Sequence, residues 1–334
     1  QRTAALNATL EDFKKASQEA SRKVMEVKAS FDLAREGTIS KKEALDKYNS
    51  TLGETLGHAN NLNEAEKILI EKADALIIES TYGDRLHRSM NDTENEMVEV
   101  ITHTLRHNGN VIIPAFAVGR TQEIIFLLID LIRQKRLPHL SIWVDSPMAS
   151  SVSKLTEDHL SLLDQEAQSI YQWYQSNPNR LELRFVTEVE ESKALNQIKG
   201  GAIVISASGM CEAGRIVHHL KWNLPYRNNA IIITGFQAQG TLGRRLVDQA
   251  KSVHLFGKEI PVKASIHTIG GLSAHADQAA LLRWLKGFKQ APAHTFITHG
   301  EIKAANLFKE VMQKQLMWDH VHIPTLSSTY PLWP

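Results

Sequence analysis

The stretch GAIVISASGMCEAGRIVHHLKW, residues 201–222, contains the pattern that decides the fold. It begins with a short apolar run at 201–208, continues through a loop of small residues and ends in a helical pattern at 216–222. A short run that is apolar at almost every position is typical of a strand buried on both faces, as in a parallel sheet. The stretch therefore predicts one strand–loop–helix unit of an α/β protein.

The same pattern recurs on both sides of this stretch. Further short apolar runs, each followed by Gly, Ser or Pro, lie at 75–80, 110–116, 141–146 and 230–236. Helical patterns lie at 121–134, 278–288 and 304–313, and two more expected strands lie at 265–269 and 294–299. Strands that alternate with helices predict a doubly wound parallel sheet with helices on both faces, and the last block of the chain can form a separate layer.

The first part of the chain has a different character, because residues 7–73 are polar and contain no proline. Apolar residues recur at three- and four-residue intervals from Leu10 to Phe31, which predicts an amphipathic helix. Ser40 with Glu43, and Asn63 with Glu66, have the spacing of helix capping boxes. We therefore expect an α-helical segment over residues 1–73, an αα-hairpin followed by a short third helix.

Charge and composition exclude several classes of protein. The 334 residues include 38 Lys and Arg against 37 Asp and Glu, a net charge of +1. This balance excludes a globally basic nucleic-acid binder, so any site for a polyanion must be local. At 43% hydrophobic residues the chain can bury a real core, which excludes disorder as its main state.

The single cysteine and the hydropathy pattern bear on the compartment. Cys211 is the one cysteine, so the chain has no internal disulfide and no cysteine-based zinc site, as is usual in a reducing compartment. No apolar run approaches the ~18 residues that span a bilayer, and no signal peptide pattern opens the chain. We expect a cytoplasmic protein without a membrane partner. The chain begins with Gln1, which favours a fragment of a longer protein.

Four loops of small and polar residues follow expected strands, and three of them contain glycine and arginine. They are AVGRTQE at 117–123, DSPMAS at 145–150, SASGMCEAGR at 206–215 and GFQAQGTLGRR at 235–245. Ligands of an open parallel sheet bind beyond the carboxyl ends of its strands, beside helix N-termini. Glycine permits close backbone approach and arginine donates to phosphate oxygens, so the loops together favour an anion site, although each alone is explained by a tight turn.

Two other motifs support weaker interpretations. Gly209 to Ile216 has the glycine spacing of a P-loop, but Arg215 replaces the lysine and Ile216 replaces the metal-binding hydroxyl, which leaves an NTPase poorly supported. His320 and His322 form an H-x-H pair with no third ligand close by, and His218 and His219 lie in a helical pattern where packing or surface roles are usual.

Six motifs carry a resemblance to a known family. They are IIESTYGDR (77–85), IPAFAVGRTQE (113–123), DSPMA (145–149), SASGMCEAGR (206–215), GGLSAHADQAALLRWL (270–285) and FITHGE (296–301). Over about residues 71–334 the chain closely resembles the β-CASP branch of the metallo-β-lactamase-fold RNA-processing nucleases, with the motifs in the family's order. Residues 37–66 are faintly similar to helical stretches of phage tail tape-measure proteins, and this similarity carries no catalytic residue.

The resemblance to β-CASP nucleases implies roles at the matching positions. Glu79 matches the acid that orients the motif histidine, and His275 matches that histidine, the general acid that protonates the leaving oxygen. His299 matches a ligand of one of two catalytic zinc ions. Arg120 and the loop with Ser208, Gly209 and Arg215 match segments along the RNA phosphate path. The alternative for Glu79 and His275 is a purely structural hydrogen bond.

The resemblance also implies domain limits. We expect the last strand of a truncated metallo-β-lactamase half at 74–85, a β-CASP domain at 86–262 and the C-terminal part of the αββα metallo-β-lactamase sandwich at 263–334. The family's H-x-H-x-D-H signature does not occur, and His58 is the one histidine before Glu79. A lone His299 would bind zinc poorly, because zinc sites use three or four protein ligands.

Two function classes remain open from the sequence. The first is a ribonuclease that hydrolyses RNA phosphodiester bonds with two zinc ions. It would be inactive as this chain alone, and the missing half would come from a second chain or copy, or be absent because the gene model is incomplete. The second is a non-catalytic pseudo-nuclease that binds RNA or acts as a scaffold. The half that the resemblance implies to be missing would leave a sheet uncovered, so we expect exposed apolar surface and association with another copy or chain.

Overall fold

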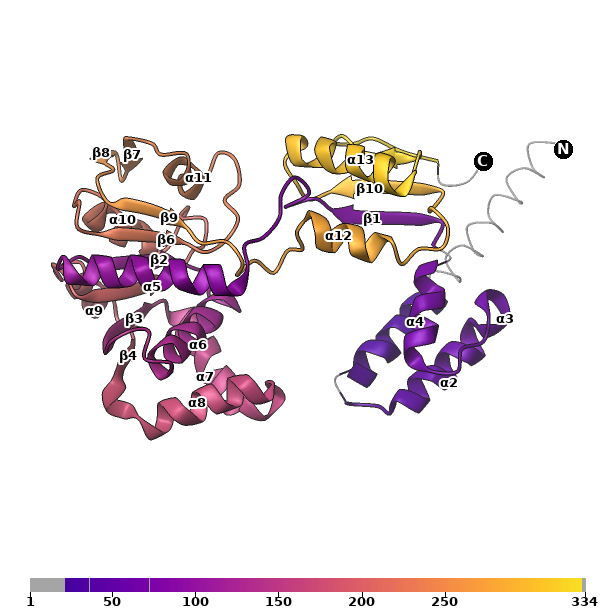
Figure 1. Cartoon of the computed structure of the whole chain (residues 1–334), viewed down its shortest axis with the longest axis horizontal. Coiled ribbons are helices and arrows are strands. Elements are labelled where there is room, and N and C mark those ends of the chain that lie inside the picture. The colour runs from indigo at the N-terminus through magenta and orange to yellow at the C-terminus, as the bar shows by residue number, and fades with distance from the viewer. Residues whose placement is uncertain (1–21, 36, 72, 332–334) are drawn as a thin grey trace. The chain divides into compact units, whose positions relative to one another are not determined.

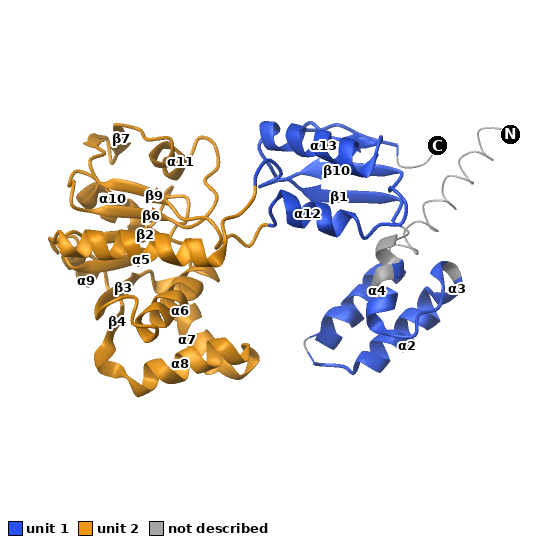
Figure 2. Ribbon diagram, in the orientation of Figure 1, with its two compact units in different colours: residues 1–85, 276–334 blue, residues 86–275 orange. Residues whose placement is uncertain are grey.

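The computed structural model describes residues 22–35, 37–71 and 73–331 (Figure 1). The chain divides into two compact units, coloured separately in Figure 2. Unit 1 combines residues 1–85 with residues 276–334, and unit 2 is the continuous segment 86–275.

Unit 2 is built around a six-stranded parallel sheet. Its strands, in spatial order, are β4 (Leu181–Phe185), β3 (Leu140–Asp145), β5 (Ala202–Ser206), β2 (Val111–Pro114), β6 (Ala230–Ile233) and β9 (Ser265–Thr268). Every neighbouring pair is parallel. The central strands β2, β5 and β6 are buried at every residue, which explains why their sequences are continuous apolar runs instead of alternating ones.

Helices cover both faces of this sheet. They are α5 (Met90–Arg106), α6 (Arg120–Arg133), α7 (Pro147–Asp158), α8 (Gln165–Ser176), α9 (Val189–Leu195), α10 (Arg215–Asn223) and α11 (Leu242–Val247). On β2, Ile113 packs in one hydrophobic cluster with residues of α5 and α6, whereas its neighbour Ile112 packs in another with residues of α10 and α11. Because successive strand residues point to opposite faces, the expected doubly wound α/β arrangement is confirmed (Figure 1).

Three strands of unit 2 did not follow from the apolar runs. The sequence of edge strand β4 is LELRF, in which Arg184 lies over the Trp143 ring at 4.8 Å instead of in a core. Strands β7 (Ser252–Leu255) and β8 (Lys258–Pro261) form a short antiparallel hairpin. Strand β9 pairs with β6, and the compact unit continues to His275, whereas the sequence-based limit of the β-CASP domain is residue 262.

Unit 1 contains a three-stranded parallel sheet with the order β1 (Ala75–Glu79), β10 (His294–Thr298) and β11 (Val321–His322). Leu76, Ile78 and Ile297 share one hydrophobic cluster with residues of α12 (Gln278–Leu285) and α13 (Ile302–Leu316). The alternating residue Ile77 is 72% exposed. This sheet therefore has one covered face and one face with an exposed apolar side chain.

The described part of the N-terminal segment is helical, as expected. Residues 22–35 form a helix, followed by α2 (Lys41–Thr51), α3 (Gly53–Leu56) and α4 (Leu62–Glu71). The capping box of Ser40 and Glu43 is present, but the second predicted cap is wrong by two residues, because Asn61 accepts the Glu64 N–H at 2.9 Å. Residues 1–21 of the predicted first helix lie outside the described residues. No helix within the described ranges is long and apolar enough to cross a membrane.

Candidate functional site

Glu79, His275 and His299, predicted from the sequence, are brought together. Glu79 is the last residue of β1, and its register partner on β10 is Thr298, so His299 follows at the same edge of the sheet. His275 stands one peptide bond before Ala276, where the chain enters the second segment of unit 1. One ligand atom from each of the three side chains lies within 4.8 Å of the others.

Local contacts inside unit 1 hold the segment that follows His275. Asp277 begins α12 by accepting the Ala280 N–H at 2.8 Å, and it forms an isolated parallel bridge with Tyr82. Gln278 donates through its side chain to the Gly83 carbonyl at 2.7 Å. These bonds tie the start of α12 to the loop after β1, at positions three and four residues beyond Glu79.

Thr81 connects two members of the cluster. Its Oγ1 lies 2.7 Å from Glu79 Oε2 and 3.0 Å from His299 Nδ1, and the residue is 3% exposed. Imidazole carries one ring proton when neutral, so an Nδ1–H that donates to Thr81 leaves the Nε2 lone pair for a metal ion. Thr81 was not predicted from the sequence, although it stands two residues after Glu79 in the same motif.

Gly300 lets the two strand ends approach closely. A Cβ atom at this position would lie 2.2 Å from Ser80 Oγ and 2.6 Å from the Ser80 carbonyl oxygen. His299 itself has a φ of 48°, in the left-handed region. The H-G sequence after β10 is therefore required by the backbone geometry that brings His299 beside the end of β1.

The donor set of the cluster fits one zinc ion. Two imidazoles and one carboxylate are typical ligands of catalytic zinc, which keeps a fourth position for water or substrate. Zinc bonds of about 2.0 Å place tetrahedral ligands about 3.3 Å apart, so separations within 4.8 Å need side-chain shifts of about 1.5 Å at most. No second group of three such ligands occurs in the described part of the chain, so these residues do not fit a two-zinc centre by themselves.

The H-x-H pair does not form a comparable group. His322 Nε2 lies 3.3 Å from His294 Nδ1, and the His294 and His320 rings are 6.1 Å apart. His322 belongs to β11, whereas His320 precedes that strand. The weak interpretation of this pair as a metal site therefore gains no support, because the described residues hold no group of three close ligand atoms there.

The four predicted ligand loops of unit 2 lie at one edge of the six-stranded sheet. They follow β2, β3, β5 and β6, which are consecutive in the sheet and all parallel. Gly119 and Gly214 begin α6 and α10 with φ values of 79° and 82°, which favour glycine. The sequence correctly predicted that these loops share the carboxyl edge.

Both predicted phosphate-binding arginines have protein partners. Arg120, with a side chain 11% exposed, forms an ion pair with Glu123 at 3.0 Å. Arg215 donates to Asp145 Oδ1 at 2.7 Å and to the carbonyls of Val186 at 3.1 Å and Thr187 at 2.7 Å. The structure gives Arg215 an internal role that the sequence did not predict, and phosphate binding by both arginines stays a prediction.

The other two predicted phosphate contacts, Ser208 and Gly209, lie where the loops after β5 and β6 touch. Gln237 donates through Nε2 to the Gly209 carbonyl at 2.9 Å. Ser208 Oγ and Gln237 Oε1 are buried without a hydrogen-bond partner among the described residues. Two unsatisfied polar atoms at one loop contact favour a bound water or polar ligand there.

A buried polar network lies under these loops and was also missed. Asp145, fully buried at the end of β3, accepts from His219 Nε2 at 2.6 Å, from Ser192 Oγ at 2.6 Å and from Arg215 at 2.7 Å. Burial alone would raise the pKa of Asp145, but the hydrogen bonds outweigh burial and lower this pKa. The network joins β3 to the first turns of α9 and α10.

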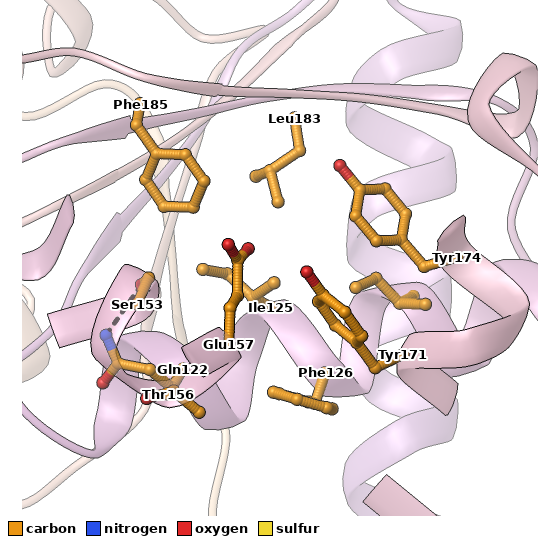
Figure 3. Close-up of a pocket in the computed structure, with 11 residues that line it drawn as sticks. Gln122, Ile125, Phe126, Ser153, Thr156, Glu157, Tyr171, Tyr174, Leu183 and Phe185 are labelled. Carbon is orange, nitrogen blue, oxygen red and sulfur yellow. Dashed lines mark hydrogen bonds between the residues drawn. The ribbon is translucent and has the colours of Figure 1, made fainter. Parts of the chain in front are cut away.

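A small cavity of about 20 Å³ lies among α6, α7, α8 and β4, with room for about one water molecule. Figure 3 shows the Glu157 carboxylate pointing between Phe185, Leu183 and the hydroxyl ends of Tyr171 and Tyr174. Burial raises the pKa of Glu157 above 4.5, against a hydrogen bond from Tyr171 that lowers it. The cavity is too small for a nucleotide and contains a carboxylate that resists ionisation.

Glu157→Gln should therefore stabilise the protein at neutral pH. A raised carboxyl pKa means that the folded state binds the proton more tightly, so stability falls as pH rises from 4.5 through the folded pKa. We expect a higher melting temperature than wild type at pH 7 and equal melting temperatures below pH 4, measured by calorimetry. Glu99→Gln, at an exposed position of α5, is the control, and a Glu157→Gln variant less stable than wild type at pH 7 would contradict the assignment.

Comparison with known proteins identifies the parts of the chain. A Beta-Casp domain matches residues 121–246, and a domain described as a Zn-dependent metallo-hydrolase RNA specificity domain matches residues 259–324. The first match begins one residue after Arg120 and includes Ser208 and Arg215. The second covers His275 and His299.

Curated relatives agree with these domains. Ribonuclease TTHA0252 of Thermus thermophilus is 39% identical over 256 residues, which are 75% of this chain and 58% of that protein. An RNase J-like protein of Methanocaldococcus jannaschii is 31% identical, covering 77% of this chain and 58% of that protein. The transcription termination factor FttA of Methanothermobacter thermautotrophicus is 29% identical, over 72% of this chain and 39% of that protein. The matches span little more than half of the first two relatives, and they show that the chain belongs to the β-CASP family of metallo-β-lactamase-fold RNA nucleases.

Proposed function

We propose that this chain carries part of the catalytic centre of a zinc-dependent ribonuclease that hydrolyses RNA phosphodiester bonds. The observation that carries the proposal is the convergence of Glu79, His275 and His299 within 4.8 Å. The loops at the carboxyl edge of the six-stranded sheet, with Arg120, Ser208, Gly209 and Arg215, provide the contacts to RNA phosphates. The names of the relatives support RNA as the substrate.

Each member of the cluster has a distinct task in this proposal. His299 binds zinc through Nε2, because its Nδ1 faces Thr81 Oγ1 at 3.0 Å. In a centre completed by a second chain or copy, His275 is not a zinc ligand: it gives a proton to the leaving ribose oxygen, and Glu79 holds the His275 ring in position. Zinc, when bound, supplies the hydroxide that attacks phosphorus and stabilises the charge that develops on the phosphate.

We also propose that the chain alone binds RNA without cleaving it. The described cluster has donors for one zinc ion, whereas in-line attack at a two-metal centre needs both ions. A second chain or a second copy would complete the site. The single buried thiol of Cys211 supports a cytoplasmic location.

Binding and cleavage of a labelled single-stranded RNA, with and without zinc, test the proposal. We expect RNA binding that weakens with salt, and cleavage no faster than the buffer control. Zinc-dependent cleavage that His275→Ala lowers by about 10²–10⁴-fold would confirm the reaction and overturn the claim that the chain alone is inactive. A chain that neither binds nor cleaves RNA would overturn both claims.

A further inference from the structure

A second cavity of unit 2 lies at the opposite edge of the six-stranded sheet from the four loops. It has a volume of about 340 Å³, in the range of small-molecule sites. Its lining comes from the segment between α9 and β5 and from the segment between α10 and β6. The cavity is therefore at the amino ends of β5 and β6, and the function proposed above makes no use of it.

Two aromatic side chains stand at this cavity. Trp222, in the last turn of α10, is 44% exposed, and Tyr226, which follows α10, is 57% exposed. Both line the cavity, and the structure records no ring contact between them within the residues it describes. Exposed aromatic faces that do not pack on one another are suited to stacking against a planar ligand.

The floor of the cavity is a rigid set of asparagines. Asn229 donates to Asn223 Oδ1 at 2.9 Å and accepts the Asn110 N–H at 2.8 Å, and all three residues are at least 95% buried. Asn110 also donates to the Ile198 carbonyl at 2.7 Å. These bonds join the amino ends of β2, β5 and β6, so the cavity wall is preformed in the unliganded protein.

One polar atom of the lining lacks a partner. Asn196 donates through Nδ2 to the Ser192 carbonyl at 3.3 Å, which assigns its other amide atom as oxygen, and this Oδ1 is buried without a hydrogen bond in the described residues. A buried acceptor without a donor is costly unless a ligand or water supplies an N–H or O–H. The exocyclic amino group of a nucleobase is such a donor.

Charge also favours a nucleotide. The lining includes Lys199 and no carboxylate. Lys221 precedes Trp222 in the chain, and its Nζ lies 5.8 Å from the centre of the Trp222 ring. A stacking surface with cations at its border and no acid suits a base attached to a phosphodiester chain better than it suits an uncharged sugar.

We propose that this cavity binds an unstacked base of single-stranded RNA, with Trp222 and Tyr226 as stacking surfaces and Asn196 Oδ1 accepting from the base amino group. The inference rests on RNA being the substrate, but it does not depend on zinc or on cleavage. It gives unit 2 a second RNA contact, at the edge of the sheet opposite the phosphate loops.

Fluorescence titration of the full chain with adenosine 5′-monophosphate and with an octamer of adenylate, in EDTA to prevent zinc chemistry, tests the proposal. We expect quenching in the wild type and in Trp284→Phe, but its loss in Trp222→Phe. Trp284 is the matched control, because it is 47% exposed and lies in unit 1. Trp222→Ala should weaken octamer binding by about 5- to 100-fold.

Tyr226→Ala and Asn196→Leu are independent variants, because both residues lie outside α10. We expect Tyr226→Ala to weaken binding of octamers of any base. We expect Asn196→Leu to weaken binding of the adenylate octamer more than binding of an abasic octamer. Octamer binding that is unchanged in Trp222→Ala and Tyr226→Ala would overturn the inference while leaving the proposed hydrolase intact. Quenching at Trp222 by a neutral disaccharide instead of the nucleotides would overturn it as well.

Discussion

Asp145→Ala should lower the free energy of unfolding of unit 2 by about 3–5 kcal/mol, because it removes the carboxylate of a buried ion pair, which is the acceptor that three side chains share. Asp145 is fully buried and contacts Arg215, His219 and Ser192 at 2.6–2.7 Å. The variant leaves the Arg215 guanidinium without its carboxylate. It also leaves His219 Nε2 without its acceptor. Because His219 Nδ1 already lacks a partner among the described residues, both ring nitrogens would then be unpaired.

Hydrogen exchange of the β3 and β5 backbone amides is the appropriate measurement, because it reports unit 2 separately from unit 1. Asp158→Ala is the matched control, since Asp158 is an exposed aspartate at the end of α7, and surface changes of this kind stay within about 0.5 kcal/mol. A loss below 1 kcal/mol in Asp145→Ala would show that the network contributes little to stability. The phosphate-binding role predicted for Arg215 would then become the better explanation of that residue.

Thr81→Val should weaken zinc binding by about 10- to 100-fold, which is the usual effect of removing a group that orients a metal ligand. Valine keeps the shape of threonine but loses the hydroxyl that lies 3.0 Å from His299 Nδ1 and 2.7 Å from Glu79 Oε2. The valine variant therefore lacks the hydroxyl that sets the tautomer and orientation of the His299 ring. Competition with a chromophoric chelator measures the change in affinity.

Thr81→Ser is the control for this prediction, because serine retains the hydroxyl and loses a methyl group. We expect the serine variant to bind zinc within a few-fold of the wild type, with melting temperatures reported for both variants. Equal zinc affinity in the valine variant and the wild type would show that Thr81 has a structural role alone. The assignment of His299 Nε2 as the metal-binding atom would then lose its main support.

The sequence predicted the parts of the fold that local patterns determine. The central strands β2, β5 and β6 are buried on both faces, so their apolar runs are unambiguous. Edge strand β4 and the β7–β8 hairpin were missed, because partly exposed strands contain charged residues such as Glu182 and Arg184 and do not give continuous runs.

Long-range contacts explain what the sequence did not reveal about the site. His218 and His219 are equivalent in the sequence, yet His218 stacks 4.5 Å from Phe256 and His219 bonds to buried Asp145. This difference depends on which face of α10 meets β3, which a local pattern does not contain. The motifs predicted Glu79, His275 and His299, which the structure brings together. Thr81 could be recognised only from its distances to Glu79 and His299.

The central claim is that Glu79, His275 and His299 form a zinc site in this chain. The zinc content of the purified chain, measured by elemental analysis after dialysis against zinc, tests it. The convergence of Glu79, His275 and His299 predicts one zinc ion per chain, lost in His299→Ala. A chain that retains no zinc would instead be the non-catalytic RNA-binding protein. Two zinc ions per chain, together with RNA cleavage that His275→Ala abolishes, would contradict the proposal that this chain holds one zinc ion and is inactive alone. The described residues offer ligands for one ion only.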